Sequence, residues 1–497
     1  MLKKFLKVIS FLLAFVCIFS VANYALSYKY FENIYRLKTF YELEDNTVDV
    51  LALGSSHTYE GINTAVLWKE YGIAGFNLCN PAQPIWNTYY YLEEALKTQT
   101  PKVIILDTYM LYISDEYSDT GTGIQNTYGL KWSQTRIDAI KASFDMEKYG
   151  YQFFFSWLQY HSRYSDVVKS DFYQYQGNEA RYKNHKGFYC YFNTTAIEDK
   201  DYTNLEELGT IPEKGEKYYR MIIELAQANN IPIIITAIPF AADSFNIKYI
   251  NTAANIAEEY GVPFYNFMRE YKDELALDYS TDFANKQHLN HKGNTKLTRF
   301  FADILSKEYN ITDKRGDEKY SSWDDDAKVY YAQLENTTLS SLPSLGTYLS
   351  AFNTDRYKII VTSTCSNYDE LSSDAKNTAS KFFSALSIDD YKNGGVWIFD
   401  GGELIWNNDM RNPDYSKSIK LGSNHTVYFC SEEKQKAITD INGEVIDTET
   451  YYANKVFINK SDKTVVAEGI NICVFDTLLQ EVVDTAGYNY SNDKFER

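Results

Sequence analysis

Five short, continuously apolar segments recur between residues 45 and 310, and they restrict the possible folds more than any other feature of the sequence. Each is too short for a helix, and the segments between them carry helical periodicity, so each is expected to form a buried strand. Apolar strands that alternate with helices indicate an α/β domain with a doubly wound parallel sheet, covered on both faces. The predicted strands are 48–53, 75–78, 103–107, 231–238 and 262–266, and the predicted helices are 61–73, 87–98, 216–228, 247–260 and 292–309.

The rest of the chain has a different character. From about residue 112 to 210 an aromatic and polar stretch interrupts the α/β rhythm, and we expect an insertion that caps the top of the sheet. Residues 311–330 are charged and lack periodicity, which predicts a linker. Residues 331–497 are expected to form an accessory α+β domain, rich in strands. Its strand candidates are 357–362, 396–399, 426–430 and 470–475, and its helix candidate is 374–386.

The N-terminal segment has the pattern of a membrane anchor. Lys3, Lys4 and Lys7 precede 21 residues without charge, and as a helix such a run would be about 31 Å long, enough to cross a bilayer. We expect residues 1–30 to be a single-pass anchor in a bacterial cell membrane. The basic residues would keep the N-terminus inside and leave the bulk of the chain extracytoplasmic. A cleaved signal peptide is the alternative, although its usual cleavage pattern is poorly formed.

Composition narrows the range of partners. The formal net charge is −18 at pH 7, which argues against the broad basic surface that nucleic-acid binding requires, so no nucleic-acid partner is expected. The chain is also unusually aromatic, with 45 Tyr and 29 Phe. Either an AT-rich genome or aromatic platforms that stack on sugar rings would account for this, and both explanations stay open.

A hydroxyl group is placed where open α/β sheets bind ligands. Gly54, Ser55, Ser56 and His57 follow the first predicted strand and precede a helix. The carboxyl end of such a strand is the usual ligand site, and the N–H groups at the start of a helix favour an oxyanion. The alternative is a plain Gly-Ser turn or helix cap.

A second motif leads into the last predicted helix of this domain. Residues 282–293 read DFANKQHLNHKG, and His288 immediately before a terminal helix can reach the edge of the first strand. A histidine alone is more often structural than catalytic, but its pairing with an upstream serine favours catalysis. His291 follows one helical turn later without any thiolate or carboxylate cluster, so no metal site is expected.

Together the two motifs resemble the SGNH (GDSL-type) hydrolase and acyltransferase superfamily over residues 45–310, which implies a flavodoxin-like α/β fold. The G-D-S block of that family reads Gly54-Ser55-Ser56, which implies that Ser56 is the nucleophile. Its D-x-x-H block, continued as H-L-N-x-x-G, ends here with His288 and Gly293, which implies that His288 is the general base. The resemblance implies no metal or organic cofactor.

The chain departs from the family pattern at three points. Asn285 stands where the triad aspartate is expected; Asp282 could supply the acid instead, a Ser-His dyad could operate, or Asn285 could orient the histidine. Ala82 replaces the glycine whose N–H would bind the oxyanion together with that of Ser56. The family's third-block asparagine has no counterpart, and Asn80 is the candidate substitute.

His57 could line the site or simply begin the helix. The anchor, the Gly-Ser-Ser block and the aromatic insertion are most similar to membrane-anchored members, the DltD-type teichoic-acid D-alanylation proteins and the alginate O-acetylation proteins. That similarity implies a serine esterase or O-acyltransferase acting on cell-envelope polysaccharide or a teichoic-acid-like polymer. An integral-membrane acyltransferase would be a possible partner. The alternative is a catalytically degenerate SGNH fold that serves as a glycan-binding or scaffold protein.

The C-terminal region has a separate resemblance. Residues 357–361, a helix near 374–386 and residues 469–476 and 482–484 are similar to the interleukin-like EMT inducer domain, which is associated with carbohydrate-related proteins. The alternative is an unrelated, strand-rich accessory module.

Overall fold

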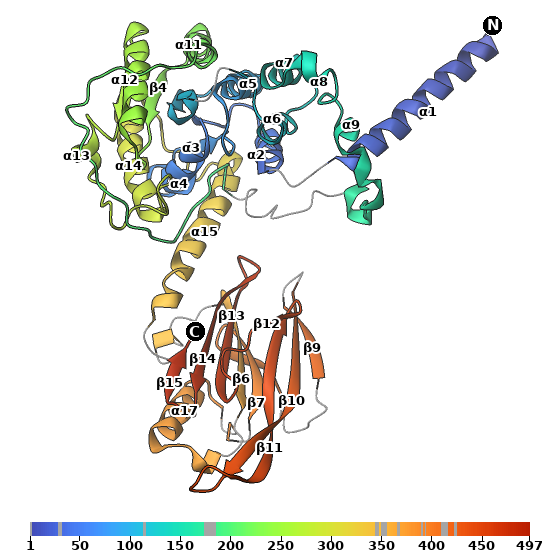
Figure 1. Cartoon of the computed structure of the whole chain (residues 1–497), viewed down its shortest axis with the longest axis vertical. Coiled ribbons are helices and arrows are strands. Elements are labelled where there is room, and N and C mark those ends of the chain that lie inside the picture. The colour runs from blue at the N-terminus through green and yellow to red at the C-terminus, as the bar shows by residue number, and fades with distance from the viewer. Residues whose placement is uncertain are drawn as a thin grey trace. The chain divides into compact units, whose positions relative to one another are not determined.

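The computed structural model of the chain is shown in Figure 1. It divides into two compact units, residues 1–330 and 331–497. The structure describes the chain apart from residues 1, 28–31, 113–115, 173–184, 343–346, 349–354, 365–367, 389–390, 393, 409–415 and 422–424.

The first unit contains a five-stranded parallel sheet. The strand order is β2-β1-β3-β4-β5, which is the flavodoxin-like order. All five strands fall within the segments that the apolar pattern predicts. They are β1 (Val50–Leu53), β2 (Gly75–Asn77), β3 (Val103–Asp107), β4 (Ile233–Ala237) and β5 (Phe264–Asn266).

Helices cover both faces of this sheet, so its strands are apolar on both sides. Leu51 and Leu53 face one core, and Val50 and Ala52 face the other. Each of these four side chains is at most 1% exposed, which is why the segment shows no polar alternation. The first core is formed with α2 (Glu32–Tyr41), α5 (Ile85–Ala95), α11 (Glu213–Ala228) and α12 (Ser244–Glu259), and the second with α4 (Thr64–Tyr71) and α14 (His291–Glu308).

The aromatic insertion has two parts rather than being one cap. Its helical part has a small core of its own, in which the rings of Phe144 and Phe153 stack with centroids 3.7 Å apart. This part packs beside α5, where Ser143 and Asn87 are hydrogen-bonded. η1 (Tyr109–Tyr112) leads from β3 into this part, and its elements are α6 (Thr120–Thr127), α7 (Gln134–Ser143), α8 (Met146–Tyr149), α9 (Ser156–Tyr160), η2 (His161–Ser165) and η3 (Lys169–Phe172).

The returning part of the insertion reaches the carboxyl edge of the sheet. Residues 188–197, which we call the strap, have no regular secondary structure and run between α3 (Ser56–Gly61) and the loop before α14. The strap is fixed by its backbone: the Tyr189 N–H donates to the Tyr59 carbonyl, and the His291 N–H donates to the Tyr191 carbonyl.

The predicted linker is wrong for most of its length. Residues 318–320 form η4 (Glu318–Tyr320), and α15 runs over Ser321–Asn336. Trp323, Ala327 and Tyr330 are buried at helical spacing, and the Trp323 indole N–H donates to the Gly75 carbonyl over 3.1 Å. The run of three aspartates hides this apolar stripe, although Asp326 is itself buried beside Trp323 and pairs with Lys186.

Helix α1 (Leu2–Leu26) is long and apolar enough to cross a membrane, judged by length and composition alone. A short helix, α13 (Lys272–Leu275), precedes the loop that carries His288.

The second unit is built from two antiparallel sheets and a helix. One face of the six-stranded sheet β15-β14-β13-β6-β7-β8 packs on α17 (Ser373–Ala385), through residues such as Val361 and Phe383. Its other face shares a core with the four-stranded sheet β12-β11-β10-β9, through Ile360 and Phe429. The strands are β6 (Tyr357–Thr364), β7 (Gly395–Asp400), β8 (Glu403–Asn408), β9 (Ser416–Leu421), β10 (His425–Thr439), β11 (Val445–Ile458), β12 (Ser461–Asp462), β13 (Gly469–Asp476), β14 (Glu481–Asn489) and β15 (Lys494–Glu496). Two short 3-10 helices, η5 (Leu339–Ser341) and η6 (Tyr368–Glu370), complete the described elements.

Candidate active site

A sharp turn after β1 carries Ser56 to the edge of the sheet. Gly54 has φ +148°, and a Cβ there would lie 2.1 Å from the Thr58 hydroxyl oxygen and 3.1 Å from the Asp107 Cβ. Ser55 precedes the helix in extended conformation, and Ser56 is the first residue of α3. The turn therefore lies between β1 and β3, where the strand order reverses and open α/β sheets bind ligands.

The side chains of Ser56 and His288 meet although they are 232 positions apart. The Ser56 hydroxyl oxygen lies 2.9 Å from His288 Nε2. On the other side of the imidazole, Nδ1 is 3.1 Å from the Asn285 amide oxygen. That oxygen also accepts the backbone N–H groups of Gln287 and His288, so it acts as an acceptor throughout. His288 Nδ1 must therefore carry the proton, which leaves Nε2 free to accept the serine proton.

Burial keeps the imidazole neutral. The pKa of His288 is lowered to about 4 because burial penalises its charged form. At neutral pH the residue is thus unprotonated at Nε2, the form that a general base requires.

A carboxylate that the sequence did not single out lies beside the same imidazole. Glu60 Oε2 is 3.4 Å from His288 Nδ1, and the Glu60 side chain is 3% exposed. Glu60 and Ser56 are four residues apart on α3 and so share one helix face. The available signal was this spacing, but the predicted helix began at residue 61, and the six-residue α3 was not expected.

Asp282 is not the acid of this site. Its buried carboxylate accepts the Asp278 N–H over 2.9 Å and the Thr281 hydroxyl over 3.0 Å, and it pairs with Lys296 Nζ at 2.7 Å. Among the described contacts none joins Asp282 to His288. Asp282 instead connects the start of the motif to α14, because the loop turns back before the histidine.

The other residues of this motif are structural. The Asn290 side chain caps α14 by accepting the N–H groups of Lys292 and Gly293. A Cβ on Gly293 would lie 2.3 Å from the Asp282 carbonyl oxygen, so glycine is required there. His291 packs its ring near that of Phe192, with centroids 5.7 Å apart. Within the described residues no group of three or more His, Cys, Asp or Glu could hold a metal ion.

The two oxyanion candidates have different surroundings. Ala82 is exposed and has φ +47°, the left-handed conformation that favours the glycine of the family pattern. Asn80 is buried, and its amide donates to the Tyr91 hydroxyl over 2.6 Å. The Asn80 amide group is therefore turned toward α5, which argues against its use as the missing third-block asparagine. The N–H of Ser56 belongs to the first turn of α3, where helices leave N–H groups without an intrahelical acceptor.

Aromatic rings form the walls around His288. The His57 ring stacks on Tyr109 with centroids 3.5 Å apart, and its centroid is 5.2 Å from that of Phe240 and 5.3 Å from that of His288. Burial, together with the neighbouring His288, holds the pKa of His57 well below its usual value, so His57 is a neutral wall residue. The Tyr191 ring of the strap lies 6.0 Å from the imidazole.

Asp107, at the end of β3, fixes the neighbouring strand ends. Its carboxylate accepts the N–H groups of Ile238 and Tyr109 over 3.1 and 3.3 Å. Burial raises the pKa of Asp107 to about 7. Because it also packs against Gly54, it helps to define the turn that presents Ser56.

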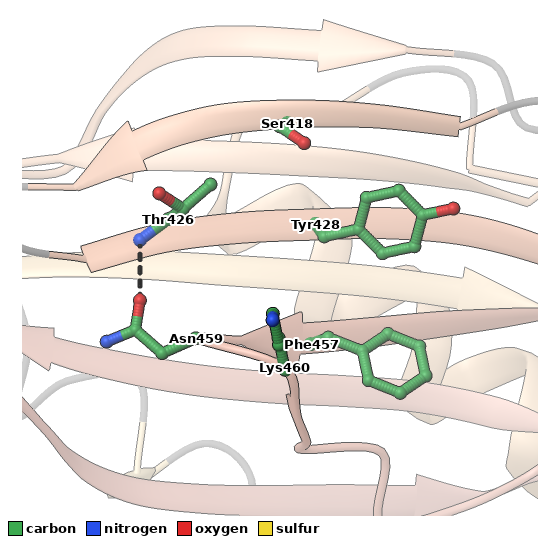
Figure 2. Close-up of a pocket in the computed structure, with 6 residues that line it drawn as sticks. All are labelled: Ser418, Thr426, Tyr428, Phe457, Asn459 and Lys460. Atoms are coloured by element: carbon green, nitrogen blue, oxygen red, sulfur yellow. Dashed lines mark hydrogen bonds between the residues drawn. The ribbon is translucent and has the colours of Figure 1, made fainter. Parts of the chain in front are cut away.

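The second unit contains a cavity of different chemistry (Figure 2). It is an open hollow of about 650 Å³ on the four-stranded sheet. The described residues that line it include hydroxyl, amide, ammonium and aromatic groups but no histidine or carboxylate, so it lacks the parts of a serine esterase site. They are Ser418, Thr426, Tyr428, Phe457, Asn459 and Lys460.

Comparison with known proteins identifies no family. No protein-family profile matches the chain, and no curated protein matches it, so the resemblance of residues 331–497 to an interleukin-like EMT inducer domain has no support. Among solved structures, a protein assigned to the G-D-S-L lipolytic family from Desulfitobacterium hafniense DCB-2 is 12% identical, with a TM-score of 0.27, and the match covers 52% of this chain and 98% of that one. A protein described as an acylhydrolase from Bacteroides fragilis NCTC 9343 is 13% identical, with a TM-score of 0.27, and the match covers 55% of this chain and 94% of that one. At these scores neither likeness carries an argument about activity.

Proposed function

We propose that this chain is a membrane-anchored serine esterase or O-acyltransferase of the SGNH type, acting on an acylated cell-envelope polymer. One observation carries the proposal: the Ser56 hydroxyl lies 2.9 Å from the unprotonated Nε2 of a histidine whose other nitrogen is held by an acceptor. This arrangement activates a serine for attack on an ester carbonyl.

In the first half of the reaction, the Ser56 oxygen bonds to the carbonyl carbon while His288 Nε2 takes the hydroxyl proton. Positive charge then develops on the imidazole, where the Asn285 amide oxygen and the Glu60 carboxylate face Nδ1. His288 next gives the proton to the departing alcohol, which leaves an acyl group on Ser56. Together Asn285 and Glu60 would replace the triad aspartate.

The carbonyl oxygen needs donors as it becomes an oxyanion. The backbone N–H groups of Ser56 and Ala82 are the candidates, because Asn80 donates its side-chain amide to Tyr91. Ala82 has a left-handed backbone conformation, which glycine adopts readily. A donor of this kind contributes roughly 3 kcal/mol to transition-state stabilisation.

In the second half the acyl group passes to an acceptor, either water or a sugar hydroxyl. We favour transfer to a sugar. The strap, with Tyr191 beside His288, would help to exclude water, and an N-terminal anchor would keep Ser56 near a membrane-borne acyl donor. Loss of O-acyl groups from the envelope polysaccharide of a Ser56→Ala strain would support transfer. Accumulation of O-acyl groups would show that the enzyme removes them.

The catalytic proposal is tested with the purified full chain and a small aryl acetate. Ser56→Ala should lower kcat/KM by at least about 10³-fold and abolish labelling by a fluorophosphonate. Ser55→Ala is the matched control, because the Ser55 side chain is fully buried and should not react. If Ser55→Ala removes activity and Ser56→Ala does not, the nucleophile is wrong. An unreactive Ser56 in a folded protein would favour the scaffold alternative.

A second candidate function, glycan binding, is favoured by the cavity of the second unit. Tyr428 and Phe457 are cross-strand partners with ring centroids 6.0 Å apart, and Tyr428 is 39% exposed. Figure 2 shows both rings on one face of the sheet, with the Asn459 amide oxygen accepting the Thr426 N–H. Aromatic faces beside amide and hydroxyl groups suit a sugar ring. Tyr428→Ala should weaken binding to envelope polysaccharide without changing aryl acetate hydrolysis; unchanged binding would contradict this function.

A further inference from the structure

Helix α1 ends in contact with the insertion rather than in solvent. The Asn23 amide oxygen accepts the Trp157 backbone N–H over 3.0 Å. The Arg163 guanidinium donates to the carbonyls of Leu26 and Ser27 over 2.9 and 2.8 Å. These are carbonyls that the end of a helix leaves without partners, and a cation is favourable there. The segment that carries Trp157 and Arg163 is therefore built to receive the end of α1 (Figure 1).

The same segment also meets α1 more than one turn before its end. The Phe19 ring lies edge-on to Phe155 and to Trp157, each with centroids 5.7 Å apart. A helix needs about 20 residues to span a hydrocarbon core of about 30 Å. If the first of these is Val8, which follows the lysines, the last is Ser27. Phe19 would then lie about 12 Å inside the far boundary of the core. The Phe155 and Trp157 rings that pack on Phe19 would therefore reach into the lipid tails, and the rest of the segment, which meets the end of α1, would lie near that leaflet's surface.

Residues 155–172, which we call the collar, have a surface suited to that depth. Among the collar side chains that the structure describes, Tyr164 is 79% exposed, Phe172 53% and Val168 50%. The exposed charged side chains of the collar are Asp166 and Lys169, since Arg163 is turned toward α1. Amphipathic aromatic rings beside a few charges are typical of the boundary between lipid tails and head groups.

We propose that the collar is a monotopic membrane-binding surface, inserted into the head-group region of the leaflet where α1 leaves the bilayer. The proposal rests on the membrane anchoring of α1 proposed above and goes beyond it. A single helix leaves the attached unit free to tilt, whereas a helix and a collar at its base hold the unit in one orientation. The collar would thereby fix the height and direction of the Ser56 site relative to the membrane surface.

The test measures the depth of spin labels on the full chain, reconstituted in phosphatidylcholine vesicles. Single cysteines are introduced in a background whose reactive native cysteines are replaced by serine. The collar variant is Tyr164→Cys. Leu13→Cys reports insertion of α1, and Phe245→Cys, an aromatic position on α12 that is 56% exposed, reports the aqueous surface. Power saturation compares collisions with oxygen, which enriches in lipid, and with a water-soluble nickel chelate.

We expect labels at positions 13 and 164 to be shielded from the nickel reagent, by at least about fivefold for position 164 relative to position 245. If the label at position 13 is shielded but the label at position 164 is as accessible as that at position 245, α1 is inserted and the collar is not. This result overturns the collar proposal and leaves the anchor intact. An accessible label at 13 overturns the anchor and with it the collar. A label at 164 that is accessible in vesicles but shielded in native membranes would identify a protein partner in place of lipid and would also overturn the proposal.

Discussion

Replacement of the Glu60 carboxylate by an amide tests how this site stabilises its histidine. Glu60→Gln keeps the shape of a side chain that is 3% exposed and lies 3.4 Å from His288 Nδ1, but replaces its carboxyl group with an amide that cannot carry a charge. An opposite charge at this distance favours the imidazolium by roughly 1–3 pKa units. At 1.36 kcal/mol per unit, the variant should lose about 1.4–4 kcal/mol of transition-state stabilisation. The expected fall in kcat/KM is therefore about 10- to 10³-fold.

The pH dependence of activity shows in which direction Glu60→Gln changes the pKa of His288. The pKa of His288 is lowered to about 4, and the reaction needs the neutral imidazole, so activity should be present above this pKa and be lost as the pH falls through it. Without the Glu60 charge, the imidazolium is less favoured and the acid limb should move to still lower pH, while the plateau falls. Initial rates of aryl acetate hydrolysis between pH 3 and pH 8 measure both quantities.

A second substitution provides the control. Asn285→Asp places a carboxylate where the amide oxygen now lies 3.1 Å from His288 Nδ1. Combined with Glu60→Gln, it should restore most of the lost kcat/KM and return the acid limb toward higher pH. If Glu60→Gln changes kcat/KM by less than twofold and leaves the acid limb in place, Glu60 is not coupled to the imidazole and the reasoning is refuted.

Three further predictions concern residues that support the structure of the site. In each case urea unfolding measures the change in the free energy of unfolding. Gly54→Ala should destabilise the first unit by at least about 2 kcal/mol, because its Cβ would overlap Thr58 and φ is +148°; a loss below 0.5 kcal/mol would contradict the turn. Ala82→Gly should stabilise by up to about 1 kcal/mol, because glycine relieves the positive φ of +47°. Asp282→Asn should cost about 1–3 kcal/mol by weakening the pair with Lys296. The substitution should leave the acid limb of the pH profile in place. A shifted limb would show that Asp282 is coupled to His288 and would contradict its structural assignment.

The local pattern of apolar residues in the sequence was enough to predict the five strands of the first sheet. It was also enough to single out Ser56 and His288 as the central residues of the site. The apolar runs give strands because each strand is buried on both faces by covering helices. Ser56 was predictable because it directly follows one such run, and His288 because it directly precedes a helix. Their meeting follows from parallel strands, whose carboxyl ends share one edge. In the second unit the pattern predicted β6, β7, part of β10 and β13, but not β8, β9, β11, β12 or β15, and not the division into two stacked sheets.

The identity of the group beside the imidazole depended on tertiary structure. The sequence left open whether Asp282 or Asn285 supports His288, but the loop turns Asp282 toward Lys296 on α14 and leaves Asn285 at His288. Glu60 reaches the same ring only because α3 packs beside a loop more than two hundred residues away. No local signal reports such a contact, since it arises from how distant elements pack.

The same reason explains the other differences. Among residues 311–330 the sequence showed charge without an evident period, yet Trp323 and Tyr330 are buried because they pack on the first unit. The insertion was expected to be one cap, but its helices form a small core of their own, and the strap brings Tyr191 beside His288. Composition and periodicity thus determined which segments form strands and helices. Long-range packing decided which side chains meet, because burial energy is gained wherever complementary surfaces come together, irrespective of their separation along the chain.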